Sequence, residues 1–308
     1  SQRYTFKGGT GLLNDRWSFD GRVSKITSDG YLDRATSDLT SFYLSGGYYG
    51  KKTIVKAIMF GGHEKTYQAW YGVDASTMAV DRRYNYAGAI YDEAGNVSRY
   101  YDNEVDDYKQ DHYQLHISQR ISERWNATVS LHYTNGSGFF EQYKQSEPFA
   151  SLRLPDVIIG GATIQESDVI VRRWLDNDYY GTTFSANYGK NSTDLTFGGA
   201  FSRYDNARHF GEIIWSEISQ NVPVRYVYYD GESEKTDVNF YTKWNQSFSE
   251  KFSSYVDIQY RKVTYETAGI DNDQTLYSVS DEFQFLNPKA GITYMLTPID
   301  MLYSSYAI

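Results

Sequence analysis

Apolar and polar residues alternate along most of this 308-residue chain, and helical periodicity is hard to find. Strict alternation is typical of β-strands that have one apolar and one polar face. The clearest stretches are residues 17–23, 42–48, 126–134, 180–188, 195–201, 238–245, 256–261 and 290–296. The pattern predicts an all-β, antiparallel protein of about twelve strands, several of them near the ~9–11 residues that a tilted membrane-crossing strand needs.

The connections between these strands are of two kinds that alternate strictly along the chain. Short, turn-like connections are expected at residues 14–16, 50–52, 122–124, 189–194, 249–251 and 297–300. Long connections rich in Tyr, Asp, Asn and Gly are expected at roughly residues 27–38, 61–111, 135–177, 203–235 and 265–281. In an up-and-down sheet, all short turns then lie at one end and all long loops at the other. This asymmetry is typical of a transmembrane β-barrel with short periplasmic turns and long extracellular loops.

Aromatic residues support the same interpretation. The chain has 31 Tyr, 16 Phe and 6 Trp, and Trp17, Trp125 and Phe252 each directly follow a short turn. That is where a barrel places an interfacial girdle of aromatic side chains. The alternative is a soluble β-rich domain, such as a carbohydrate-binding module, in which the apolar face points into a core.

Charge and cysteine content exclude several other classes. The formal net charge of -9 argues against nucleic acid as a partner, because phosphate binding needs a concentrated basic surface. The absence of cysteine removes disulfides, thiolate metal sites and cysteine nucleophiles together.

Two stretches resemble the barrel of TonB-dependent outer-membrane receptors. They are KTYQAWYGV at residues 65–73 and FLNPKAGITYMLTPIDMLYSSYAI at residues 285–308. In that family an Asn-Pro-Lys-x-Gly stretch, here residues 287–291, opens a strand that leads into a YxSYA strand, here residues 303–307. Pro288 is expected at the first residue of its strand, where it removes no donor from the ladder.

The resemblance implies a roughly 22-stranded barrel with a plugged lumen in the Gram-negative outer membrane. Such a protein imports a scarce nutrient with energy that TonB delivers through the plug domain. No plug domain, coupling segment or terminal aromatic strand is recognisable in the sequence. We therefore expect residues 1–308 to form a partial β-barrel, surrounded by outer-membrane lipid, whose plug and remaining strands are absent from this chain. No enzymatic activity and no cofactor are expected.

Catalytic or metal chemistry finds little support in the sequence. Among the five histidines, His112 and His116 form an i, i+4 pair. In a strand such a pair is about 13 Å apart, too far to share a metal ion. His116 and His132 fall on the polar faces of consecutive strands, where hydrogen bonding in the lumen is expected.

Ligand binding is the better hypothesis for the long loops, which mix aromatic side chains with arginines. Arginine binds carboxylates bidentately and stacks on flat groups, so this mixture suits an anionic, partly aromatic iron chelate of the siderophore or ferric-citrate type. Cobalamin, haem or an oligosaccharide are the alternatives. The candidate ligand-binding residues are Trp70, Tyr71, Arg82, Arg83, Arg99, Arg172, Arg173 and Trp174.

A register prediction completes the interpretation. The residues expected to face lipid are Val129, Leu131, Phe197, Phe240, Val256 and Ile258. Those expected to face the lumen are Asn126, Ser130, Asp257 and Gln259.

Overall fold

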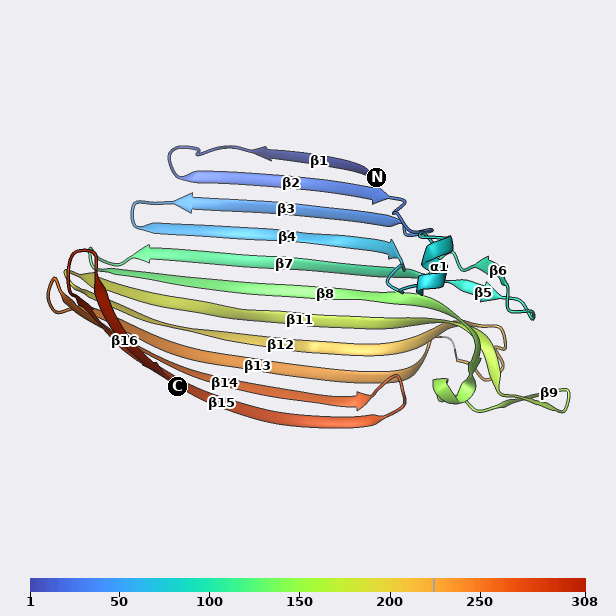
Figure 1. Cartoon of the computed structure of the whole chain (residues 1–308). Helices are drawn as coiled ribbons and strands as arrows, with labels where there is room; N and C mark the ends of the chain where they lie inside the picture. The colour runs from blue at the N-terminus through green and yellow to red at the C-terminus, as the bar shows by residue number, and fades with distance from the viewer. Residues whose placement is uncertain (224) are drawn as a thin grey trace.

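The computed structural model, which describes residues 1–223 and 225–308, contains one antiparallel sheet of twelve strands (Figure 1). The strands of this sheet are β1 (Gln2–Gly9), β2 (Trp17–Ser28), β3 (Ser37–Tyr49), β4 (Thr53–Tyr67), β7 (Val105–Arg120), β8 (Trp125–Pro148), β11 (Glu166–Lys190), β12 (Thr193–Ser216), β13 (Tyr226–Ser247), β14 (Phe252–Ile270), β15 (Leu276–Met295) and β16 (Met301–Ala307). Short elements between them are α1 (Ala75–Val80), β5 (Ala89–Tyr91), β6 (Val97–Tyr100), η1 (Phe149–Leu152), β9 (Val157–Ile159) and β10 (Ala162–Ile164).

The strands lie in the sheet in the same order as in the chain, and each pairs with its neighbours in that order. The expected twelve strands and their up-and-down, antiparallel arrangement are therefore confirmed. The sheet is open: β1 and β16 are its two edges and do not pair with each other in the described residues. Within those residues, no helix is long and apolar enough to cross a membrane.

The six connections expected to be short lie at one end of the strands, and the five expected to be long lie at the other (Figure 1). The difference in length holds for four of these five, because the connection at residues 271–275 is no longer than that at 296–300 and is shorter than that at 10–16. The boundaries expected for the long connections were wrong, because the strands extend much further. The connections span residues 29–36, 68–104, 149–165, 217–225 and 271–275. At this end both faces of the strands mix polar and apolar residues, so the alternation fades although the hydrogen-bonded ladder continues.

The register fixes which side chains share a face, because directly opposite residues in an antiparallel ladder point the same way. Val129 lies opposite Phe184, and the same row continues through Gly199 to Phe240. We call this side of the sheet the outer face and the other side the inner face. All six residues expected to face lipid lie on the outer face, and all four expected to face the lumen lie on the inner face.

Aromatic residues mark the short-turn boundary of the outer apolar band. Trp17 contacts Tyr48 at a ring separation of 4.9 Å, and Trp125 contacts Tyr188 at 5.0 Å. Trp17, Trp125 and Phe252 are the first residues of β2, β8 and β14, as expected. A second aromatic row on β7, β8 and β11, formed by Tyr113, Tyr133 and Tyr180, marks the opposite boundary.

The apolar band crosses the ladder obliquely. Trp17 lies next to the short turns on β2, and the residues directly opposite one another from strand to strand lead from Trp17 to Leu286 on β15 in nine steps. The aromatic residue next to the short turn on β15 is instead Tyr294, which lies eight residues from Leu286 along the strand. With ~3.3 Å per residue and ~4.8 Å between strands, this drop corresponds to a strand tilt of about 30°. The eight residues from Trp125 to Tyr133 then span roughly 23 Å along the band normal, close to the ~25 Å height of the apolar band of membrane barrels.

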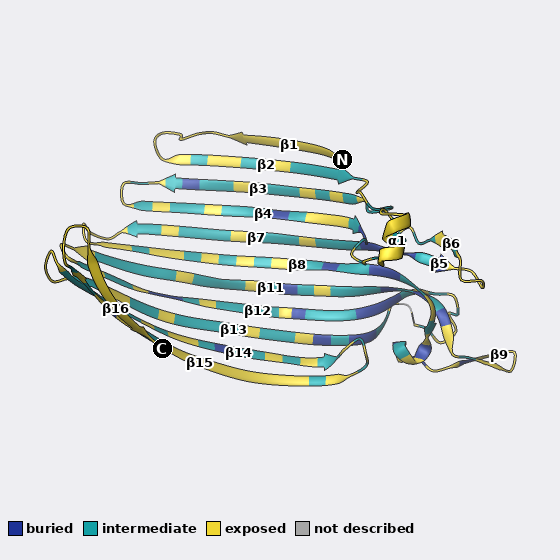
Figure 2. Cartoon of the chain, viewed as in Figure 1, coloured by how far each residue is buried: buried dark blue, intermediate teal, exposed yellow. Residues whose placement is uncertain are grey.

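Bulges bend the sheet where it approaches the long connections. Extra residues interrupt the register of β8 near Ser146, of β12 at Asn206 and of β13 near Tyr228. Ser146 and Asn206 have positive φ angles of 49° and 48°. Bulged strands bend and twist more strongly, and the ends of β8 and β11 turn sharply in Figure 1. Buried residues, dark blue in Figure 2, gather at this end of the sheet.

Pro288 does not open a strand as expected but lies inside β15, opposite Ile258. Its carbonyl accepts a hydrogen bond from the Ile308 N–H beyond the end of β16, so its ring nitrogen points to the same side. The pairing of β15 with β16 begins only at Lys289. The proline therefore supplies no N–H donor on the side of β15 that faces β16.

The two faces should respond differently to a charge. Val256→Arg places a guanidinium in the middle of the outer apolar band, where the expected cost is roughly 2–4 kcal/mol. Gln259→Arg places the same group on the inner face, beside Tyr241 and Asn287. We expect the first variant to reduce the folded fraction recovered from cells at least severalfold and the second to leave it near wild type. Equal assembly of the two variants would contradict the assignment of the faces.

Candidate ligand-binding site

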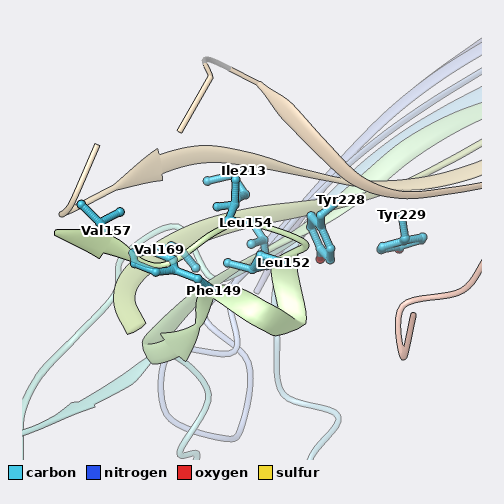
Figure 3. Close-up of a cluster of buried hydrophobic side chains, with 9 residues drawn as sticks. Phe149, Leu152, Leu154, Val157, Val169, Ile213, Tyr228 and Tyr229 are labelled. Atoms are coloured by element: carbon cyan, nitrogen blue, oxygen red, sulfur yellow. The ribbon is translucent and has the colours of Figure 1, made fainter. Parts of the chain in front are cut away.

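The connection between β8 and β11 folds over the inner face at the long-connection end. Phe149, Leu152 and Val157 from this connection are almost fully buried against Val169 and Ile213 of the sheet (Figure 3). The completed cluster also contains Leu154, Val171, Tyr228 and Tyr229. This is the apolar core of the described residues, and it fixes one wall of a site on the inner face.

Glycines on the inner face create room for aromatic rings that lie across them. A Cβ atom at Gly211 would overlap the ring of Tyr229, and one at Gly231 would overlap Tyr277 and His209. The Tyr277 hydroxyl and His209 Nε2 are 3.0 Å apart and hydrogen bonded. Rings that cover glycines in neighbouring strands stabilise a sheet, and they also present flat aromatic surfaces on this face.

Trp70, Phe140 and Arg173 form a second aromatic group beside this row. Trp70 packs edge-on against Phe140 at 5.8 Å, and the Arg173 guanidinium lies 5.6 Å from the centre of the Phe140 ring. Tyr71 stacks on Tyr86 at 4.9 Å, and its hydroxyl accepts a hydrogen bond from the Gln142 amide. Trp70 keeps half of its surface exposed, which leaves an aromatic side available to a ligand.

Arg173 is the cation of this group. It lies opposite Phe140 on one side and Gly211 on the other, so its side chain belongs to the inner face. Its Nε is buried and has no hydrogen-bond partner among the described residues. Burial raises the pKa of Tyr228 and of Tyr229, and the nearby Arg173 charge opposes this effect only in part. Both phenols therefore stay neutral and can donate hydrogen bonds.

Arg172 and Trp174 were expected in a loop, but both lie in β11 and belong to the outer face. Arg172 Nε donates a 2.7 Å hydrogen bond to Glu141, whose side chain is 2% exposed. Trp174 Nε1 donates a 2.7 Å hydrogen bond to the buried Glu212, which also pairs with Arg225 at 2.8 Å. Arg172 neutralises the buried Glu141, and Trp174 donates to the buried Glu212, which Arg225 neutralises; both side chains therefore have structural roles.

The other candidate arginines are spread apart. Arg82 is exposed, and Arg83 is exposed and forms a 3.3 Å ion pair with Asp33. Arg99 lies near Tyr143. Burial and a hydrogen bond to Asp168 raise the pKa of Tyr143 to about 12. Of the eight candidates, the structure therefore brings together Trp70, Tyr71 and Arg173.

Sequence reasoning missed Phe140 and Tyr229 as members of this site. Both follow the inner-face parity of their strands, which a continued alternation beyond residue 134 could have revealed for Phe140. The alternation of β13 also places Tyr229 on the inner face, because the odd-numbered residues from Tyr241 to Tyr229 share that face and the bulge begins only at Tyr228. The described residues contain no group of His, Cys, Asp or Glu side chains arranged to hold a metal ion.

The structure resembles solved receptors and transporters over nearly its whole length. The ferric-catecholate import receptor Fiu from K12 E. coli matches with a TM-score of 0.60 and 11% identity over 99% of this chain and 48% of that one. The ferric citrate transporter FecA matches with 0.67 and 8% identity over 98% and 40%. The copper transporter OprC matches with 0.59 and 9% identity over 99% and 45%. No protein-family model and no curated protein matches the sequence.

The chain spans about half or less of the length of these structures. The resemblance to the barrel of TonB-dependent receptors is thus confirmed for the fold, and the neighbours are receptors and transporters rather than enzymes. Because the neighbours carry different cargoes, the fold leaves the substrate of this chain open.

The adjacent arginines should differ in their effect on stability. Arg172→Gln leaves the buried Glu141 without its cation, and we expect a loss of about 3 kcal/mol in the free energy of unfolding. Arg173→Gln removes a group without a carboxylate partner, so we expect a change below about 1 kcal/mol. Denaturant unfolding of the two variants in detergent measures the difference, and a larger loss in Arg173→Gln would contradict these roles.

The folded conformation of the connection at residues 68–104 should be more stable at low pH than at high pH. Burial raises the pKa of Glu104 to about 7 from its ordinary value of 4.5, and Glu141 adds to the rise. The folded state therefore favours the protonated form, and its stability falls as the pH rises from about 4.5 through 7. We expect proteolysis of this connection to be severalfold faster at pH 8 than at pH 5, and Glu104→Gln to remove most of that difference. A rate independent of pH in the unmodified protein would refute this.

Proposed function

We propose that this chain forms part of the wall of a transmembrane β-barrel in the Gram-negative outer membrane that imports a nutrient, and that the nutrient is an iron chelate of the siderophore or ferric-citrate type. The complete barrel has about 22 strands, and its plug and its contact with TonB lie outside these 308 residues. The oblique apolar band with its two aromatic rows supports the membrane placement, because a soluble β-sandwich buries its apolar faces between two sheets.

The single observation that carries the substrate class is Arg173 on the inner face, with a buried Nε that has no partner among the described residues. Trp70, Phe140 and the phenols of Tyr228 and Tyr229 surround it. A guanidinium among neutral aromatic groups favours an anion with flat, aromatic parts over a neutral sugar, whose hydroxyls need many paired acceptors and donors.

The site lies on the route that an entering molecule would take. It occupies the inner face at the end of the long connections, and the β8–β11 connection folds over the same face. A nutrient arriving from the outside would therefore meet the aromatic group before the polar inner wall. Binding here would concentrate a scarce ligand at the mouth of the barrel.

Uptake of radiolabelled iron chelates by a deletion strain complemented with variants of the full-length protein tests this proposal. We expect Arg173→Gln to raise the half-saturating chelate concentration about tenfold, since a charged hydrogen bond contributes ~1.5–3 kcal/mol. Trp70→Ala should raise it severalfold, since an aromatic contact contributes ~0.5–1.5 kcal/mol. Lys51→Gln, in a short turn at the opposite end, is the control and should behave as wild type.

Three other results would reverse the substrate ranking. Unchanged iron uptake in the deletion strain together with a loss of cobalamin uptake, of haem uptake or of growth on an oligosaccharide would each replace the iron chelate with that substrate. A protein that stays soluble without detergent would instead support the carbohydrate-binding module.

A further inference from the structure

We propose that a groove on the inner face of β2, β3, β4 and β7 is a second binding site for the transported anionic chelate, deeper in the lumen than the site of Arg173. This inference rests on the proposed function, because it concerns the same ligand on its way inward. The groove has a floor of small residues, two cations without carboxylate partners at its rim, and a place on the route of entry.

The shape of the groove follows from the ladder. It has a volume of about 570 Å³, within the range of small-molecule pockets. Its floor is one ladder row, in which Ser24, Ser41 and Gly62 lie directly opposite one another. The rows on either side carry larger inner-face side chains that line the groove, among them Ile26, Leu39, Phe60, Tyr108 and His112. The depression therefore results from three small residues between two bulkier rows.

Contacts among its own side chains fix one wall of the groove. The rings of Phe60 and His112 stack with a centroid separation of 4.4 Å. His112 Nδ1 lies 2.9 Å from the Thr134 hydroxyl, and its Nε2 lies 3.1 Å from the side-chain oxygen of Gln110. Because both ring nitrogens are engaged, the imidazole holds one orientation beside Phe60. A ligand would meet a preformed wall of flat rings above a floor with two serine hydroxyls, which lowers the cost of ordering the site.

The two cations at the rim are Lys7 and Arg22. They lie directly opposite one another on the inner face of β1 and β2, in the ladder row that continues to Phe60. Both residues are exposed, and neither forms an ion pair with a carboxylate of the described residues. Like charges directly opposite one another destabilise an antiparallel ladder. An anion bound beside the pair would remove this repulsion and accept charge-assisted hydrogen bonds.

The charge of the surrounding wall also favours an anion. On the inner face of β1–β4 the carboxylates are Asp20 and Glu64, and Glu64 lines the groove itself. The cations of the same face are more numerous, namely Arg3, Lys7, Arg22 and Lys56. A concave surface with an excess of positive charge raises the local concentration of anions. The groove therefore suits the same class of ligand as Arg173.

The groove lies further along the route of entry than Arg173. The ladder row of Arg173 reaches β4 at Thr66, whereas the floor of the groove crosses β4 at Gly62, four residues nearer the short turns. At ~3.3 Å per residue this corresponds to about 13 Å along the strand. A chelate released by Arg173 would meet the groove next. Successive sites that each bind moderately let a ligand enter and still leave inward.

Equilibrium binding of radiolabelled ferric citrate and of a radiolabelled ferric tris-catecholate to the purified full-length protein in detergent tests the proposal. For the probe that binds, we expect two equivalents per wild-type protein. The double variant Lys7→Gln, Arg22→Gln should weaken one equivalent about tenfold, because charge-assisted hydrogen bonds are lost. Ser41→Leu, which fills the groove without changing a charge, should remove the same equivalent. Arg173→Gln should weaken the other.

Lys25→Gln is the matched control. Lys25 lies on β2 like Arg22, but on the outer face, where it pairs with Asp38. This variant should leave both equivalents unchanged. Arg22→Lys keeps the positive charge and should retain the groove equivalent with an affinity within severalfold of wild type. Each variant is first checked for a folded barrel by its heat-dependent migration in gels.

A single equivalent in the wild type, or two unchanged equivalents in the double variant, would overturn the groove and leave the import proposal standing. The ligand-free double variant should unfold at the same temperature as wild type or a higher one, because it loses a like-charge pair. A lower unfolding temperature would assign the cations to a carboxylate of the protein outside these 308 residues, and would also overturn the groove.

Failure of the import proposal gives a different result. Two equivalents that respond to the variants as expected, in a protein whose deletion leaves iron uptake unchanged, would support the groove and refute import. Binding of neither probe would refute both.

Discussion

A single-layer sheet depends on the hydrogen-bonded ladder between neighbouring strands. In the part of the chain that the structure describes, the twelve strands have no second layer to pack against, and the buried apolar cluster lies at the long-connection end. In hydrocarbon an unpaired backbone group costs several kcal/mol, so the ladder must be continuous wherever the outer face is apolar. Because the backbone meets this constraint, side chains need only be apolar on one face and polar on the other. That requirement is loose enough for structures with 8–11% identity to share the fold.

The same constraint explains what could be predicted from the sequence. Within the apolar band each strand must alternate, which is why the number of strands, their faces and the order of short and long connections could be predicted. Beyond Tyr133 and its neighbours both faces mix polar and apolar residues, and the strands continue without an alternation that marks their ends. Residues 135–148 were therefore expected in a loop although they belong to β8.

The candidate site shows more clearly what could not be predicted from the sequence alone. Arg172 and Arg173 are neighbours in the sequence and looked equivalent, yet they lie on opposite faces of β11. One neutralises the buried Glu141, and the other lies among aromatic rings on the inner face. Their roles follow from the alternation of β11, which continues unbroken from Tyr188 to Val171. The sequence alone did not show that the strand extends this far.

The order of the strands also makes the pairing of the sheet independent of the lengths of the connections between strands. Every ladder joins strands that are consecutive in the sheet, so lengthening one connection changes the closure of a single hairpin. Doubling a flexible loop costs only about 0.6 kcal/mol of closure entropy. The connections at residues 68–104 and 149–165 can therefore gain or lose segments in the course of evolution while the wall stays intact. The sequence at this end of the molecule can therefore diversify much faster than the sheet that supports it.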